Sequence, residues 1–576
     1  MPERPLSRFS RLPRSNLFLW LPALVFLGLF FVYPLASILQ ISLERSQGSL
    51  LAPFIEVFQS PSTRQVIAFT FYQALLSTLL TLLLGLPVAY IMAHYTFRGK
   101  ALIQALSGVP FVMPTLVVAA AFNALLGPRG WVNLGLMSIF DLAAPPLHFT
   151  NTLGAILLAH VFYNTTIVLR TVGDFWSHLD PRLVQAAQVL GANRWQAIRH
   201  VSLPLLMPVI TTAAMLVFLF DFTSFAVVLL LGGPRFATME VEIYNQTVSL
   251  FNLPLAAALA IIQLVFTLVI TSGYTRLANR SSLPLSLRPH TVTQKPLASW
   301  RSRLLAGSMI AVLLLLMTAP LVSLAARSVT RFETVRGQAG SDFQGLTLDY
   351  YRELNTNRRQ SLFYATPFTS IAISLGYAGL TVLLALAIGV PAAWALARDS
   401  SSRLNRLLDP LLMLPLGASA VTMGLGFIVA LDEPPLDLRT SALLVPMAHT
   451  LVAFPFVVRS LTPAIRSIRP RLRHAASILG ATPSQVFRLV DLPLVGRALL
   501  IAATFAFTIS LGEFGATALI ARPEYPTIPV AIYRLLGQPG AVFYGQAMAL
   551  STILMVVTAA GMLAIERFRI PGTGDF

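Results

Sequence analysis

The stretch PRLVQAAQVLGANRWQAIRHVSLP at residues 181–204 recurs 289 residues later as PRLRHAASILGATPSQVFRLVDLP at residues 470–493. The same register extends without a gap over residues 159–244 and 448–533. Solenoid proteins have repeat periods of roughly 20–50 residues. So long a period instead predicts two fused halves that share one internal plan.

Composition places both halves in a membrane. Apolar residues make up 56% of the 576 residues and charged residues 11%, against roughly 25% charged in soluble domains. The apolar residues form blocks long enough to cross a bilayer. The net charge of +18 is scattered between these blocks, which is typical of topology determinants and not of a nucleic-acid site. With no cysteine, disulfides and thiolate sites are excluded.

The chain is therefore predicted to be an all-α polytopic membrane protein with about twelve transmembrane helices in two parallel six-helix repeats. We expect a first half at residues 1–276, a basic cytoplasmic linker at 277–303 and a second half at 304–576. Loops between spans that carry an excess of Lys and Arg lie on the cytoplasmic side. Most Lys and Arg residues of this chain fall on the termini and on the loops of the same side, so both termini are predicted to be cytoplasmic. The predicted spans are 17–40, 66–93, 102–126, 151–173, 205–231, 254–275, 304–326, 366–397, 407–430, 441–460, 495–520 and 543–565.

The repeated stretch is polar and precedes the fifth span of each half. Pro181 and Pro470 suit the first turn of a short helix, and Gly191 and Gly480 suit its left-handed C-terminal cap. A second short helix is expected at residues 195–201. The pattern predicts a helix–turn–helix outside the membrane, with small alanines exposed for a partner protein. An amphipathic helix lying on the bilayer is the alternative, which the duplication disfavours.

These loops resemble the cytoplasmic loop of permease subunits from type I ATP-binding-cassette importers, with the pattern Glu-Ala-Ala-x3-Gly-x9-Ile-x-Leu-Pro. In that family the loop docks into a cleft on a separate ATPase subunit. Gln185 and His474 stand where the family has Glu. By this resemblance the ATPase-coupling residues are Gln185, Ala186, Ala187, Gly191, Pro204, His474, Ala475, Ala476, Gly480 and Pro493.

The fused arrangement, with residues 222–244, 512–515 and 527–533, resembles fused iron(III) and thiamine permeases. The resemblance implies a binding-protein-dependent importer permease in the bacterial plasma (inner) membrane. Its implied partners are two copies of a cytoplasmic ATPase, an extracytoplasmic solute-binding protein and lipid, with no nucleic acid. No cofactor is expected in the chain itself, because ATP would be bound by the ATPase.

The chain is not expected to be an enzyme. Its two lysines, Lys100 and Lys295, lie outside any phosphate-binding loop of the Gly-x4-Gly-Lys-Ser/Thr type. A secondary transporter is the alternative, because twelve spans in two parallel halves also describe that class. Such a transporter has no reason to duplicate a helix–turn–helix. An integral membrane enzyme lacks a convergent nucleophile and base.

Two acids and two histidines fall inside predicted spans. Asp221 and Glu513 are candidates for lining the translocation path, because a carboxylate at membrane depth is costly and usually faces a cavity or a partner. Hydrogen bonding within the helix bundle is the equally weighted alternative. His160 and His449 occupy matching positions, and hydrogen bonds between packed helices are favoured over a metal site, so no metal is expected.

Overall fold

The computed structural model describes residues 14–44, 52–281, 294–297, 299–334, 341–356, 365–398, 403–432 and 436–568. Within these residues, eleven helical segments are long and apolar enough to cross a membrane, and a twelfth span would combine two helices bent by 95°. The predicted all-α, twelve-span class in two repeats is confirmed.

Six of the eleven candidate spans lie in the first half, together with a set of short helices. Its elements are α1 (Arg14–Leu27), η1 (Gly28–Val32), α2 (Tyr33–Glu44), α3 (Ala52–Gln59), α4 (Pro61–His94), β1 (Tyr95–Thr96), α5 (Lys100–Val112), α6 (Thr115–Leu126), α7 (Trp131–Phe140), α8 (Leu153–His178), α9 (Pro181–Val189), α10 (Arg194–Ala197), η2 (Ile198–Ser202), α11 (Leu203–Phe222), α12 (Ala226–Leu231), α13 (Met239–Val248) and α14 (Leu253–Ser281).

The second half repeats this order, with a hairpin and two short helices after its first span. Its elements, with β2 (Lys295–Pro296) before them, are α16 (Trp300–Ser328), β3 (Thr330–Thr334), β4 (Ser341–Leu346), α17 (Asp349–Arg352), η3 (Glu353–Asn355), α18 (Pro367–Arg398), α19 (Arg403–Gly417), α20 (Ala420–Ala430), α21 (Leu444–Arg466), α22 (Pro470–Ile478), α23 (Pro483–Val486), η4 (Phe487–Asp491), α24 (Leu492–Gly512), α25 (Gly515–Ile520), α26 (Ile528–Leu536) and α27 (Ala541–Phe568).

Several predicted spans are interrupted. The expected spans 102–126 and 407–430 each consist of two helices, because Pro114 and Ser419 adopt extended backbone between them. The Ser419 hydroxyl accepts a hydrogen bond from the Thr422 amide and so starts a new helix there. The expected spans 205–231 and 495–520 were also too long. Helices α11 and α24 end at Phe222 and Gly512, and α12 and α25 follow as separate short helices.

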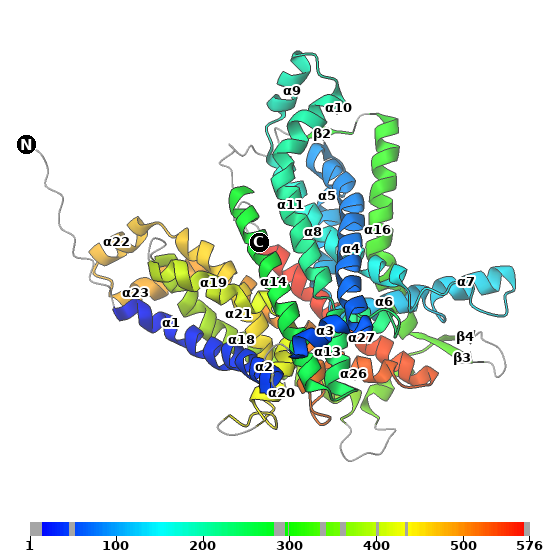
Figure 1. Ribbon diagram of the computed structural model, residues 1–576. Coiled ribbons are helices and arrows are strands. Elements are labelled where there is room, and N and C mark those ends of the chain that lie inside the picture. The colour runs from blue at the N-terminus through cyan, green and yellow to red at the C-terminus, as the bar shows by residue number, and fades with distance from the viewer. Residues whose placement is uncertain are drawn as a thin grey trace, which may run out of the picture.

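The halves meet at one end and diverge toward the other (Figure 1). Helices α9 and α10 lie at the top of this view and α22 and α23 at the left, so the two repeated loops are far apart. We call the region where the halves meet, which contains α6, α12, α13, α20, α25 and α26, the shared end. The largest buried apolar cluster draws residues from both halves there.

Each half is completed by the first span of the other. Helix α1 packs on α18 and α2 packs on α20, whereas α16 packs on α4 and α6. The indole Nε1 of Trp20 donates to Asn405 Oδ1 at 3.2 Å, and Phe26 meets Phe454 edge-to-face. Hydrophobic periodicity within one segment carries no information about which half it will cover, so this exchange was not predicted.

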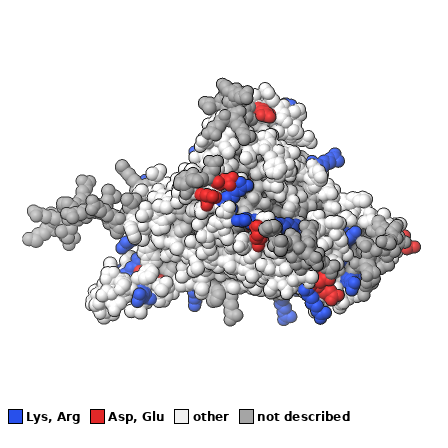
Figure 2. Space-filling model, turned by 90° about the horizontal axis from the view of Figure 1, so that it is seen from below, with Lys and Arg blue, Asp and Glu red and all other residues white. Residues whose placement is uncertain are grey.

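The predicted linker is only partly within the described residues, because positions 282–293 and 298 lie outside them. Its described part includes β2, which pairs in parallel with β1 of the first half. The half boundaries at 276 and 304 stay a prediction. Seen from below, the surface is largely uncharged, with charged side chains in small separate groups (Figure 2).

Candidate functional site

The two repeated loops fold alike. Helices α9 and α22 both begin at a proline and end before a glycine with left-handed backbone, Gly191 at φ 91° and Gly480 at φ 85°. In each loop the residue after the glycine donates its amide to a carbonyl five residues back, at 3.0 Å. This bond is typical of a Schellman cap, so the predicted C-terminal caps are confirmed.

A second cap follows in both loops. Asn193 and Gln196 exchange side-chain and backbone hydrogen bonds at 2.8 and 2.9 Å, and Thr482 and Gln485 form the equivalent capping box. The second helix then passes into a five-residue π-helical turn, η2 or η4, before the fifth span begins. Two different pairs of capping residues therefore produce the same turn at the same place.

The loops present apolar side chains to solvent. Val189 and Leu190 are 87% and 88% exposed, and their copies Ile478 and Leu479 are 85% and 87% exposed. The predicted positions Ala186 and Ala475 are exposed as well. An isolated exposed leucine needs no explanation, but the same pair at the same turn of both halves indicates a docking surface. Sequence analysis missed this pair, although apolar residues beside a predicted cap outside the membrane were its signal.

The remaining predicted loop residues lie around these helices. Gln185 and His474 are exposed on α9 and α22, and Pro204 and Pro493 are exposed in the first turn of α11 and α24. Ala187 and Ala476 are half-buried. Their role in coupling to an ATPase stays a prediction.

The second loop has an ion pair whose two residues are not repeated in the first. Arg473 Nε donates to Asp491 Oδ1 at 2.7 Å, and Asp491 is buried. The equivalent positions of the first loop hold Val184 and Ser202. The pair ties α22 to η4 in the second loop.

Deeper in the first half, Asp221 belongs to a buried polar group. Its Oδ1 accepts from Asn164 Nδ2 at 2.6 Å and lies 3.4 Å from His160 Nδ1. The other ring nitrogen of His160 lies 2.8 Å from Ser224 Oγ. These contacts bind the end of α11 to α8 at the point where the fifth span breaks.

The second half builds the same group with acid and serine exchanged. His449 Nδ1 lies 2.7 Å from Ser510 Oγ, and its Nε2 lies 3.2 Å from Glu513 Oε2. Glu513 also accepts from the backbone amides of Ala516 and Thr517 at 2.8 and 3.1 Å. In the repeat register Ser510 occupies the place of Asp221, and Glu513 that of Ser224. The equivalent histidine of each half therefore contacts one carboxylate. That carboxylate comes from the earlier position in the first half and from a position three residues later in the second half.

Both predicted path residues are therefore buried within their own halves. Asp221 is 1% and Glu513 8% exposed, with contacts of the kind expected from the alternative in which the carboxyl is bonded inside the bundle. Their lining of a path stays a prediction. The favoured interpretation of His160 and His449 matches their contacts. Among the described residues, no group of three or more His, Asp and Glu side chains suited to a metal ion occurs.

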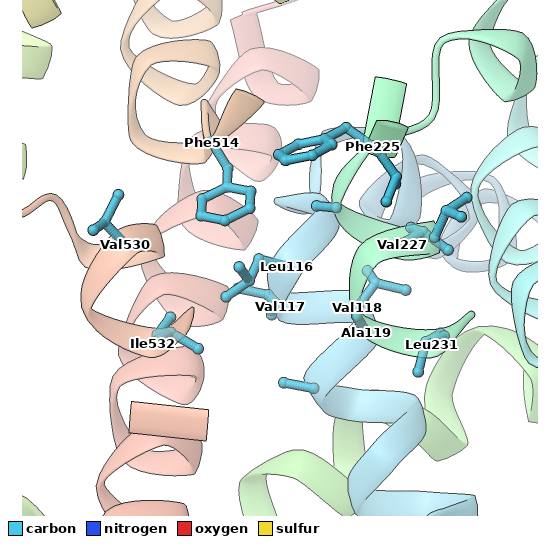
Figure 3. Packing of buried hydrophobic residues seen from close by; sticks show 14 of the residues in the cluster. Leu116, Val117, Val118, Ala119, Phe225, Val227, Leu231, Phe514, Val530 and Ile532 are labelled. Carbon is cyan, nitrogen blue, oxygen red and sulfur yellow. The ribbon is translucent and has the colours of Figure 1, made fainter. Parts of the chain in front are cut away.

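Directly after these breaks, two aromatic rings face each other between the halves (Figure 3). Phe225 and Phe514, which are repeat equivalents, stack with centroids 5.6 Å apart and planes at 20°. Tyr244 packs on Phe225 at 5.3 Å and Tyr533 on Phe514 at 5.4 Å, both at 55°. We call these four side chains the axial rings.

A cavity of about 330 Å³ lies beside the axial rings at the shared end. Leu230 and Leu231, which follow Phe225 on α12, and Leu536, one turn after Tyr533, form part of its wall. Its polar lining comes from Asn123, Arg129 and Tyr544, and the Tyr544 hydroxyl donates to Asn123 Oδ1 at 3.2 Å. The remaining lining residues are Ala119, Ala120 and Pro128.

Comparisons with known proteins agree with this duplicated plan. The family described as "Binding-protein-dependent transport system inner membrane component" matches residues 85–282 and again residues 385–569. The thiamine transport system permease protein ThiP of Escherichia coli K12 is 28% identical over 511 residues, covering 85% of this chain and 87% of its own. ThiP of Brucella abortus strain 2308 is 28% identical over 508 residues, covering 87% of each chain. Among solved structures, a chain of a bacterial ABC transporter that imports alginate is 21% identical, covers 48% of this chain and has a TM-score of 0.38.

Proposed function

Because the chain belongs to the family of binding-protein-dependent transport system inner membrane components, we propose that it is the whole two-half permease of an ATP-driven importer. In this proposal each half supplies one docking loop to one of two copies of a cytoplasmic ATPase. An extracytoplasmic binding protein delivers the solute at the shared end. The chain itself has a transport role, and ATP is bound and hydrolysed by the partner.

The observation that carries this proposal is the matched pair of exposed loops. Each is a rigid helix–turn–helix with two caps, and each exposes an apolar pair at the same turn. A rigid element joined directly to the fifth span transmits movement from a partner into the membrane. Two such elements fit a partner that acts as a dimer. A secondary transporter, driven by an ion gradient, has no use for them.

The divergence of the halves supports a state of the permease that is open on the side of the two loops. The two repeated loops are far apart, and the halves diverge from the shared end toward these loops (Figure 1). With the loops in the cytoplasm, as the distribution of Lys and Arg predicts, this is an arrangement open to the cytoplasm. Closure of the ATPase dimer would then bring the loops together and open the shared end to the binding protein.

We propose thiamine as the solute. The two relatives described above are thiamine permeases that match this chain over most of its length. Iron(III), the other solute that the sequence resemblance implied, has no such support and we do not propose it. Specificity in such systems rests largely with the binding protein, so the permease has to accept what that protein delivers.

Reconstituted vesicles provide the test. The chain, its ATPase and its binding protein are placed in proteoliposomes, and uptake of radiolabelled thiamine is followed with and without ATP. We expect uptake only with all three proteins and ATP. Vesicles with the chain alone and a proton or sodium gradient are the control for the secondary transporter. Accumulation in that control would overturn the importer proposal, whereas ATP-driven uptake of another solute would overturn thiamine alone.

A further inference from the structure

We propose that the axial rings, Phe225, Tyr244, Phe514 and Tyr533, form a transient binding site for an aromatic cation and close the path when it is empty. The inference rests on the proposed importer function and adds a solute-recognition site inside the permease. The solute would be contacted by the faces of the four rings, and the buried acids would only hold the backbone that carries the two phenylalanines.

Position on the axis is the first step of the argument. Parallel repeats are related by an axis along the membrane normal, and equivalent atoms lie at equal distances on opposite sides of it. Phe225 and Phe514 are equivalent and in contact, so the axis passes between their rings. Tyr244 and Tyr533, which pack on these two phenylalanines, are repeat equivalents too. A solute that moves between the halves along this axis has to part both pairs.

The rings form a seal in the present state. Phe225 is 7% and Phe514 2% exposed, and their stacked faces cover each other. The next shell, Leu116 and Val117 of α6, is apolar and buried (Figure 3). No side chain of this seal can bind a solute while the rings are stacked. Binding therefore requires the opening that the ATPase would drive.

Parted rings expose chemistry suited to one class of solute. An aromatic ring has a negative face, and several rings around one space bind quaternary and heteroaromatic cations. The two phenylalanines would enclose a flat cationic ring from both sides, with a tyrosine at each edge. A sodium-sized ion gains little from this geometry because it keeps its hydration shell, and an anion is repelled by the ring faces.

Nearby charged and polar side chains affect where a cation can bind and how the rings are held. Arg129 lines the cavity at the shared end, so a cation is disfavoured in that cavity. On the other side, the His160–Asp221 and His449–Glu513 groups hold the backbone just before each phenylalanine. The rings are thus placed by buried hydrogen bonds, which fixes the geometry that recognition needs.

The first experimental arm measures thiamine uptake by the complete reconstituted transporter with Phe225→Leu, Phe514→Leu, Phe225→Tyr and Phe514→Tyr. Leucine keeps an apolar side chain and removes the ring face. Because a desolvated cation–π contact contributes about 1–2 kcal/mol, we expect each leucine variant to raise the apparent KM for permease transport about 5- to 30-fold. Tyrosine keeps a ring face and should stay within about 2-fold.

Phe220→Leu is the matched control, because Phe220 lies on the span that ends just before Phe225, is 40% exposed and is not one of the axial rings. It should leave uptake unchanged. Equal KM values for the leucine variants and this control would overturn the binding site. If the unaltered transporter moves no thiamine, the proposed solute is wrong, and the second arm decides the inference about the rings.

That second arm uses charge selectivity and needs no thiamine. Because the chain has no cysteine, Phe225→Cys introduces a single thiol. Its modification during ATP turnover is compared between trimethylammonium-ethyl and sulfonato-ethyl methanethiosulfonate. Relative to a free thiol, the cationic reagent should be favoured at least about 10-fold, and adding Phe514→Leu should reduce this preference. A preference equal to that of the free thiol, or one that survives loss of Phe514, would refute the site.

Discussion

Removing one exposed leucine from each docking loop should weaken ATPase binding in two equal steps. Leu190 and Leu479 are 88% and 87% exposed, so almost the whole side chain of each is available for burial by a partner. Burying a leucine contributes about 1.5–3 kcal/mol, and serine forgoes nearly all of it. Leu190→Ser or Leu479→Ser should therefore cost about 2 kcal/mol.

For an ATPase dimer that binds both loops at once, this is about a 30-fold rise in Kd for each single variant, and on the order of 1,000-fold for the double variant. Binding would be measured by titrating the ATPase onto the chain immobilised in lipid nanodiscs. Thiamine uptake by the same variants should fall in the same order. The equality of the two single effects follows from the repeat, because each leucine sits at the same position of the same turn.

The control is Gln188→Ser, an exposed polar position on α9 where the second loop already has Ser477. It should leave Kd unchanged. An unaltered Kd for the leucine double variant would refute the assignment of these loops as the ATPase-docking surface. Loss of binding in one single variant only would refute the equivalence of the two loops.

Three further outcomes are expected. Gly191→Trp with Gly480→Trp, at left-handed positions with φ of 91° and 85°, should abolish uptake while membrane insertion is retained; normal uptake would contradict the coupling role. Asp491→Asn removes the charged partner of Arg473 and should cost about 1–3 kcal/mol in the second loop, seen as faster hydrogen exchange at residues 470–493 but not at 181–204. His449→Ala should lower stability by about 2 kcal/mol in thermal unfolding, because a buried carboxylate loses a hydrogen-bonding partner; an unchanged midpoint would show that the His449 contacts are dispensable.

The loops were predictable because their structure is local. A proline, an apolar spacing and a glycine within one short stretch specify a helix and its end. The cap at Gly191 needs a positive φ of 91°, which glycine adopts without strain. Because the same pattern recurs 289 residues later, the prediction made for one loop applied to the second loop as well. The same register identified Phe225 with Phe514, although contact between them is visible only in three dimensions.

The breaks in the spans were not predictable from hydropathy. Hydropathy alone did not divide the segments on the two sides of Ser419, although Pro415 and Gly417 just before it are residues that commonly interrupt a helix. The convergence of Asp221 and Ser224 on one histidine also escaped sequence analysis. Aligning the halves places Asp221 opposite a serine and suggests divergence, whereas folding brings either position within reach of the same ring because one helical turn separates them.

The exchange of first spans governs the order in which the protein can be completed. Trp20 and its partner Asn405 are 385 positions apart in the chain. During synthesis the first span enters the membrane long before the helices it will cover exist, and it has to remain there without its final neighbours. Cutting the chain in the linker would yield two fragments, each of which contains a first span that packs on the other fragment. Because the two halves are fused, they are synthesised in equal numbers and stay close to each other until both have been inserted in the membrane.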